Sequence, residues 1–99
     1  MLYLLEARVI GKVQRVMFRD FVLRKAKKLK LSGFVQNQKD GTVFVKCCGN
    51  KEDVEKMLEN LKKGPFLANV KDVEYSIKQV DECKFNDFKI IYRNFLDRF

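Results

Sequence analysis

The stretch "SGFVQNQKDGTVFVKCC", residues 32–48, contains two short runs of β-type residues with a turn between them. We predict strands at residues 32–38 and 42–48, because both runs hold β-branched and aromatic side chains. Asp40 and Gly41 form an Asp-Gly pair between them, which favours a tight hairpin since glycine tolerates a positive φ. The two strands are therefore expected to be neighbours in a sheet.

One helix is predicted on each side of this hairpin. The first covers residues 19–30 and the second residues 51–63, since apolar side chains recur with helical spacing in both. The apolar positions are Phe18, Val22, Ala26 and Leu29 in the first helix, and Val54, Met57, Leu58 and Leu61 in the second. Asn50 stands where the second helix would be capped, and Gly64 with Pro65 marks its end.

Three further strands lie outside the two helices. Residues 3–10 and 70–79 alternate between apolar and polar side chains, and residues 88–92 form a short last strand. The order β-α-β-β-α-β with an extra C-terminal strand indicates an α+β, ferredoxin-like sandwich: an antiparallel sheet with two helices on one face. Residues 1–92 are expected to form one domain, with residues 93–99 as its tail, which could either pack on the body or fray.

The charge and the hydropathy limit the classes of function. With 21 Lys and Arg against 13 Asp and Glu, the net charge of +8 predicts attraction to nucleic acid, anionic lipid or phosphorylated small molecules, or serves solubility alone. No apolar run approaches the ~20 residues that a membrane span needs. The start, "MLYLLEARVI", lacks a basic segment and a cleavage site and is typical of a strand rather than a signal peptide. A cytoplasmic protein without a membrane partner is expected.

The three cysteines, Cys47, Cys48 and Cys83, form no recognisable framework. Cys47 and Cys48 are neighbours in a predicted strand and should point to opposite faces. The chain contains no histidine and no Cys-x-x-Cys spacing. We therefore expect reduced thiols, no disulfide framework and no metal site.

The segment "GKVQRVMFRDF", residues 11–21, connects the first predicted strand to the first helix. A helix start leaves about four backbone N–H groups without partners, and no Ser, Thr, Asp or Asn directly precedes this helix to cap them. Unpaired amides at a helix N-terminus bind anions, and Arg19 adds a planar guanidinium that matches two phosphate oxygens. Alternatively, water or downstream backbone satisfies these amides.

The same segment resembles the acylphosphatase family. "GKVQRVMFR" resembles its Gly-x-Val-Gln-Gly-Val-x-Phe-Arg loop, and "GFVQNQKDGTVFVKCCG", residues 33–49, resembles its Gly-x-Val-x-Asn motif and the strand that follows. The likeness extends over about residues 4–91. It implies a ferredoxin-like fold and hydrolysis of a carboxyl–phosphate anhydride to a carboxylate and inorganic phosphate.

The resemblance also implies roles for individual residues. Arg19 matches the family's catalytic arginine, which binds the phosphoryl group, and Asn37 matches the catalytic asparagine, which positions the attacking water. The implied phosphate-binding loop consists of the backbone at Gln14, Arg15, Val16, Met17 and Phe18, completed by Arg19.

The implied substrate suits a site without histidine, metal or other cofactor. A carboxylate has a pKa of about 4, so it leaves without a general acid at neutral pH. Phosphoryl transfer through a loose transition state needs mainly positioning and charge stabilisation, which backbone amides and one guanidinium can supply.

One residue departs from the family pattern: Arg15 stands where the loop has its second glycine. If this position needs a positive φ, a non-glycine residue costs about 1 kcal/mol or more. The Arg15 side chain could obstruct the loop, or its charge could strengthen phosphate binding. A domain that binds phosphate without turnover is one alternative that follows.

A second alternative is a non-catalytic phosphate- or nucleic-acid-binding ferredoxin-like module, because fold alone does not fix function. The charge of +8 favours such a partner. Ferredoxin-like RNA binders, however, place several aromatics in one central strand, whereas "TVFVKCCG", residues 42–49, has only Phe44. This argues against nucleic acid, and we expect a monomer whose partner is a small acyl phosphate.

Overall fold

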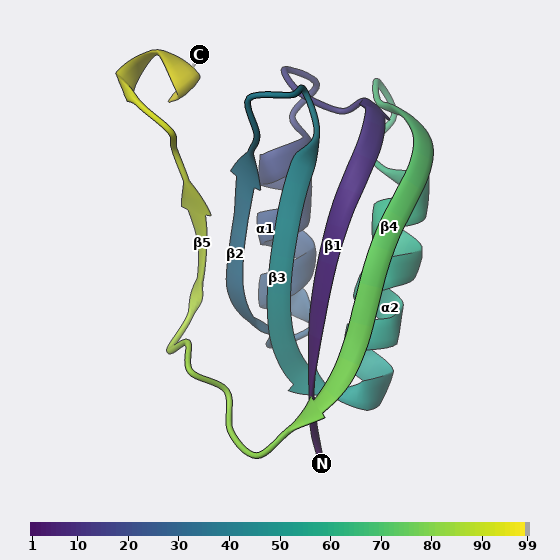
Figure 1. The fold of residues 1–99 in the computed structure, drawn as a ribbon, viewed down its shortest axis with the longest axis vertical. Helices are drawn as coiled ribbons and strands as arrows, with labels where there is room; N and C mark the ends of the chain where they lie inside the picture. The colour runs from purple at the N-terminus through teal and green to yellow at the C-terminus, as the bar shows by residue number, and fades with distance from the viewer. Residues whose placement is uncertain (99) are drawn as a thin grey trace.

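The computed structural model describes residues 1–98, apart from the side chains of residues 95 and 98. The elements along the chain are β1 (Leu2–Lys12), α1 (Phe18–Lys28), β2 (Ser32–Asn37), β3 (Val43–Asn50), α2 (Lys51–Lys63), β4 (Asn69–Val80), β5 (Phe88–Ile91) and the short 3₁₀ helix η1 (Phe95–Arg98) (Figure 1). The predicted order of strands and helices is confirmed.

The five strands form one sheet in the order β4-β1-β3-β2-β5. The pairs β4–β1, β1–β3 and β3–β2 are antiparallel, whereas β5 runs parallel to β2, so the sheet is mixed. Both helices lie on the same face of this sheet (Figure 1). The predicted α+β, ferredoxin-like architecture with an extra C-terminal strand is therefore confirmed, and the predicted antiparallel arrangement holds for four strands but not for the pairing of β5 with β2.

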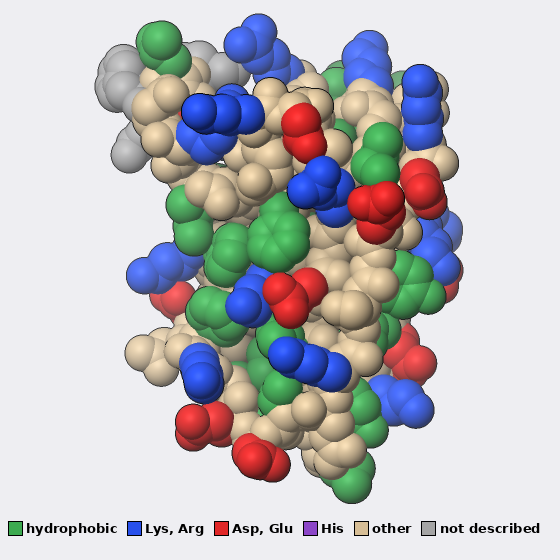
Figure 2. Space-filling model, viewed as in Figure 1, with side chains coloured by type: hydrophobic (Ala, Val, Ile, Leu, Met, Phe, Trp, Pro, Cys, Tyr) green, Lys and Arg blue, Asp and Glu red, His purple; other side chains and the backbone are tan. Residues whose placement is uncertain are grey.

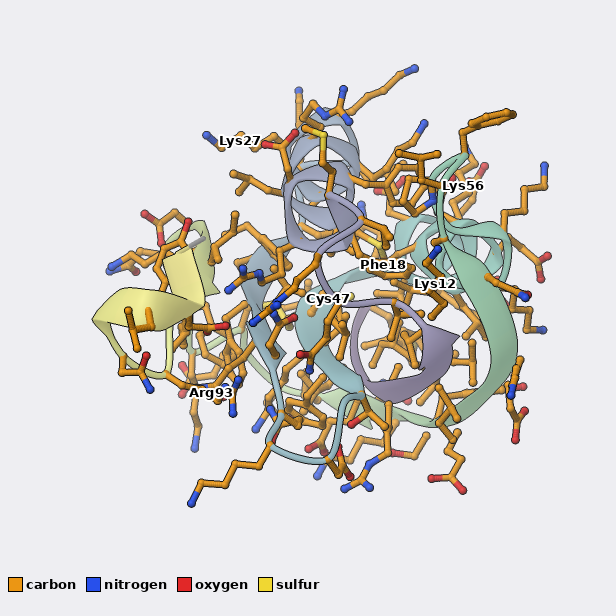
Figure 3. All side chains as sticks on the ribbon, turned by 90° about the horizontal axis from the view of Figure 1, so that it is seen from above. Lys12, Phe18, Lys27, Cys47, Lys56 and Arg93 are labelled. Atoms are coloured by element: carbon orange, nitrogen blue, oxygen red, sulfur yellow. A yellow bond between two sulfur atoms is a disulfide. The ribbon has the colours of Figure 1, made fainter. Side chains whose placement is uncertain are left out.

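The core lies between the helices and the sheet. All four residues of the predicted apolar stripe of α2 are buried, as are Phe18, Val22 and Ala26 of α1. Strand residues such as Leu5 and Val45 face them from the sheet, and Phe18 lies in the interior (Figure 3). Burial of each large apolar side chain contributes roughly 1.5–3 kcal/mol relative to exposure, so these faces fix the helices on the sheet.

The loops that connect β1 to α1 and β2 to β3 lie at the same end of the sheet (Figure 1). Gly41 in the β2–β3 turn has φ 91°, the conformation for which glycine was expected there. Blue Lys and Arg side chains line this upper end of the molecule in the space-filling view (Figure 2). Among the described residues, no helix is long and apolar enough to cross a membrane.

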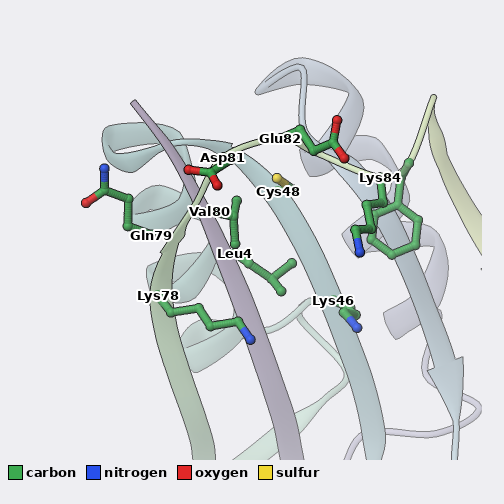
Figure 4. A pocket seen from close by; sticks show the side chains of 10 residues that line it. Leu4, Lys46, Cys48, Lys78, Gln79, Val80, Asp81, Glu82 and Lys84 are labelled. Carbon is green, nitrogen blue, oxygen red and sulfur yellow. The ribbon is translucent and has the colours of Figure 1, made fainter.

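The expectation that the thiols are reduced is wrong for two of the three cysteines. Cys48 and Cys83 form a disulfide with their Cα atoms 5.7 Å apart. Cys48 faces the helix-free side of the sheet, in a hollow of about 640 Å³ that Lys46, Lys78 and Glu82 help to line (Figure 4). The pairing escaped prediction because residues 81–87 cross this end of the sheet, which no local pattern reveals.

Cys47 is the free cysteine and points into the core, so the prediction of opposite faces for Cys47 and Cys48 is confirmed. Burial raises the pKa of the Cys47 thiol to about 12. Its neutral thiol therefore behaves as a small apolar core side chain.

Candidate active site

The segment between β1 and α1 has an unusual backbone. Arg15 and Met17 both have φ 61°, in the left-handed region, and Val16 between them does not. Such alternation turns successive N–H groups toward one point and forms an anion-binding nest. The side chains of Val16 and Phe18 are buried, whereas those of Arg15 and Met17 are exposed. The side chains of Val16 and Phe18 thus fix the loop to the core.

The backbone amides of this loop are not used inside the protein. Among the described residues, the amides of residues 14–19 donate no hydrogen bond to a carbonyl or a side chain. The first helical hydrogen bond runs from the Phe21 amide to the Met17 carbonyl oxygen at 3.0 Å, and Met17 provides no side-chain cap. The amides at this end of α1 can therefore bind an external anion.

Gln14 holds the loop in place. Its Nε2 donates to the carbonyl oxygens of Gln38 and Thr42, both at 2.8 Å. These carbonyls belong to the β2–β3 turn, so the Gln14 side chain links the loop to the hairpin that carries Asn37. Its side-chain donors are occupied, and the backbone is the part of Gln14 that can face a phosphate.

The fold brings Arg19 and Asn37 together although 18 positions separate them. Arg19 lies on the first turn of α1 and Asn37 is the last residue of β2. Both line a hollow of about 260 Å³, which Arg15, Met17 and Phe18 also help to line. Val16 does not line this hollow, because its side chain points into the core.

Asn37 is 3% exposed and carries an unusual oxygen. Its Nδ2 donates to a carboxylate oxygen of Asp97 at 3.3 Å, which fixes the orientation of the amide because a carboxylate only accepts. Its Oδ1 is the only buried side-chain nitrogen or oxygen of the described chain that lacks a hydrogen-bond partner. An unpaired buried acceptor costs about 1–3 kcal/mol, so this atom suits a ligand or water that donates a hydrogen bond to it.

Asp97 is the residue of this site that the sequence did not predict. Its Oδ2 lies 3.1 Å from Nη1 of Arg19, and its carbonyl oxygen lies 2.7 Å from Nη2 of the same guanidinium. The residues after β5 therefore pack on the body rather than fray, whereas Phe99 lies outside the described residues. The contact joins positions 78 residues apart, and no motif marks it.

The Asp97 carboxyl is ionised at neutral pH. Burial raises its pKa, but the hydrogen bond from the Arg93 amide, the charge of Arg19 and the hydrogen bond from the Asn37 side chain together lower it by more. The pKa of Asp97 therefore lies below its ordinary value. A negative charge thus rests between Arg19 and Asn37. Across residues 1–98, no group of three His, Cys, Asp or Glu side chains is placed to hold a metal ion.

The chain is similar to known proteins of one family. A family profile described as acylphosphatase matches residues 5–90. An acylphosphatase of Aliivibrio fischeri is 44% identical over 82 residues, which are 83% of this chain and 89% of that protein. An acylphosphatase of Archaeoglobus fulgidus is 38% identical over 88 residues, covering 89% and 97% of the two chains.

The fold is shared with solved structures. The crystal structure of acylphosphatase from Bacillus subtilis superposes with a TM-score of 0.85 at 34% identity, and the match covers 93% of this chain and all of that one, 100%. The profile spans both β1–α1 and β2–β3, the segments that carry Arg19 and Asn37. The chain therefore belongs to the acylphosphatase family.

Proposed function

We propose that this protein hydrolyses acyl phosphates, with the β1–α1 loop and Arg19 binding the phosphoryl group and Asn37 orienting the attacking water. The observation that carries the proposal is the meeting of Arg19 and Asn37 on one anionic group beside a loop of unused amides. Membership of the acylphosphatase family supports the same chemistry.

The loop and Arg19 supply the charge stabilisation. A phosphoryl oxygen that lies in the nest accepts hydrogen bonds from the amides, and the N-terminal end of the α1 dipole adds partial positive charge. The Arg19 guanidinium pairs with a second oxygen in a two-pronged, charge-assisted contact. In a loose transition state, these fixed positive groups stabilise the charge spread over the phosphoryl oxygens.

Asn37 supplies the positioning. Its buried Oδ1 can accept a hydrogen bond from a water molecule, and its Nδ2 can donate to the same anion as Arg19, as both groups do to Asp97. The water oxygen bonds to phosphorus while the bond from phosphorus to the acyl oxygen breaks, and the carboxylate leaves with that electron pair. Both protons of the water stay on the oxygens of the phosphate, which is released as dihydrogen phosphate. The released carboxylate needs no proton because its pKa is about 4. Positioning of the water in line replaces a strong base.

The test is steady-state hydrolysis of benzoyl phosphate by the full chain and two variants. We expect Arg19→Gln and Asn37→Ala each to lower kcat/KM by about 100-fold or more, as removal of a transition-state donor usually does. The matched controls are Arg24→Gln and Asn60→Ala. Arg24 is an exposed arginine of α1, and the side chain of Asn60 makes an exposed hydrogen bond within α2. Both should retain activity within about twofold, the range of surface changes.

Full turnover in a folded Arg19→Gln or Asn37→Ala protein would exclude the assigned roles. Inorganic phosphate should inhibit competitively, because it is the product and fits the same nest. We also propose that one chain suffices, since every group named above comes from a single copy. A monomer in sedimentation equilibrium at the enzyme concentration of the assay is the expected result.

A further inference from the structure

The C-terminal residues lie directly on the proposed catalytic groups. After β5, the chain turns at residues 92–94 and forms η1, which stands beside the end of the sheet that carries the site (Figures 1 and 3). The Asp97 side chain, 5% exposed, lies between Arg19 and Asn37. Tyr92 also covers Arg19, with its ring centroid 5.0 Å from the guanidinium carbon.

We propose that residues 93–98 act as an intramolecular inhibitor, in which the Asp97 carboxylate binds Arg19 and Asn37 and must leave before a phosphoryl group binds. The inference rests on the proposed function, because it takes Arg19 and Asn37 as the substrate-binding groups. It identifies the C-terminal tail as a competitor of the substrate.

The competition follows from the donors that Asp97 uses. Both terminal nitrogens of Arg19 donate to Asp97, one to the carboxylate and one to the carbonyl oxygen. The Nδ2 of Asn37 donates to the other carboxylate oxygen. A phosphoryl group is an anion with acceptor oxygens of the same kind, so it requires the same two terminal nitrogens of the guanidinium. Two anions side by side would also repel each other.

The tail is shaped to present this carboxylate. The Arg93 amide donates to Oδ2 of Asp97 at 3.0 Å, and the Asp97 amide donates to Oδ1 of Asn94 at 3.1 Å. These contacts close a small turn whose members are all in the tail. Asp97 is therefore held by its own segment in an orientation that faces Arg19.

The attachment of the tail to the body is mainly polar. Leu96 is 75% exposed, and the side chains of Arg93 and Asn94 are also exposed. Among the described side chains of residues 93–98, only that of Asp97 hydrogen-bonds to the body of the protein. Such a segment can open at small cost, as expected of weakly packed chain ends.

The consequence is a lower apparent affinity for phosphate and for substrate. When only a fraction of molecules has the tail open, the observed dissociation constant equals the intrinsic constant divided by that fraction. Removal of the Asp97 charge should shift molecules to the open form. The substitution that removes this charge leaves Arg19 and Asn37 themselves in place.

The experiment compares Asp97→Asn with the full wild-type chain and with Asp87→Asn. The control removes the same charge from an exposed residue of the segment before β5. Inorganic phosphate binding is measured by calorimetry, and KM and kcat with benzoyl phosphate. We expect Asp97→Asn to bind phosphate roughly tenfold more tightly and to lower KM similarly, the size expected for loss of one charge-assisted contact.

In the expected result, kcat stays within about threefold, and Asp87→Asn matches the wild type. Asn94→Ala, which loosens the turn, should shift phosphate binding in the same direction by a smaller factor. Weaker or unchanged phosphate binding by a folded Asp97→Asn variant would overturn the proposal that the tail is an inhibitor. So would a lower kcat/KM, because Asp97 would then hold Arg19 in its active position.

The two proposals fail separately. Tighter phosphate binding by Asp97→Asn without hydrolysis by any variant would support the inhibitor and refute the proposed function. Hydrolysis by the wild type with unchanged phosphate binding in Asp97→Asn would refute the inhibitor alone.

Discussion

Replacement of Arg15 by glycine is expected to stabilise the protein by about 0.5–1 kcal/mol. Arg15 has φ 61°, and the left-handed region costs an L-residue roughly 1–2 kcal/mol. Glycine avoids this cost but loses about 0.5–1 kcal/mol more backbone entropy on folding. The Arg15 side chain is exposed and makes no hydrogen bond or ion pair with another described residue, so its removal sacrifices neither.

The assay is thermal and urea unfolding of Arg15→Gly beside Arg24→Gly. A gain of this size raises Tm by about 2–8 °C in a domain of this length. Arg24 is an exposed arginine inside α1, where glycine should instead cost about 1 kcal/mol. The same chemical change is thus predicted to have opposite signs at the two positions. Equal destabilisation of both variants would refute the strain at Arg15.

Two further predictions concern the cysteines. Reduction of the Cys48–Cys83 disulfide should lower the free energy of unfolding by about 4 kcal/mol, the chain-entropy value for a loop of 35 residues, and urea titrations with and without reductant measure it. For Cys47, burial raises the pKa from 9.0 to about 12, so the native state keeps a proton that the unfolded state loses. Its contribution to stability is therefore complete below pH ~9 and falls by at most ~1.4 kcal/mol per pH unit up to the native pKa. A Cys47→Ala protein, unfolded in urea at the same pH values, should lack that part of the decline.

Features encoded in neighbouring residues were predictable. The helix α2 begins and ends at the predicted residues, because its apolar stripe and Gly64 are local signals. The prediction for α1 was less accurate, since the helix covers Phe18–Lys28 rather than residues 19–30. It ends before Lys30, which has φ 56°, a conformation that glycine usually provides at helix ends. With lysine there, the sequence gives no stop signal.

The site was predictable only as far as its motifs extend. Arg19 and Asn37 lie in two segments whose spacing resembles a known pattern, and the fold places both at one hollow. Asp97 lies in a tail with no such pattern, and its partners are 78 and 60 residues away. A contact of that separation depends on strand direction and order, which single-segment patterns do not encode.

The direction of β5 explains why Asp97 can reach the site at all. Residues 81–87 carry the chain from the end of β4 to the opposite edge of the sheet, and the Cys48–Cys83 disulfide ties that crossing to β3. The chain therefore enters β5 beside the start of β2 and must run parallel to it, with Phe88 opposite Gly33 and Ile91 opposite Gln36. Since Asn37 is the next residue of β2, β5 ends level with the site. An antiparallel β5 would have carried the carboxylate to the other end of the sheet, far from Arg19.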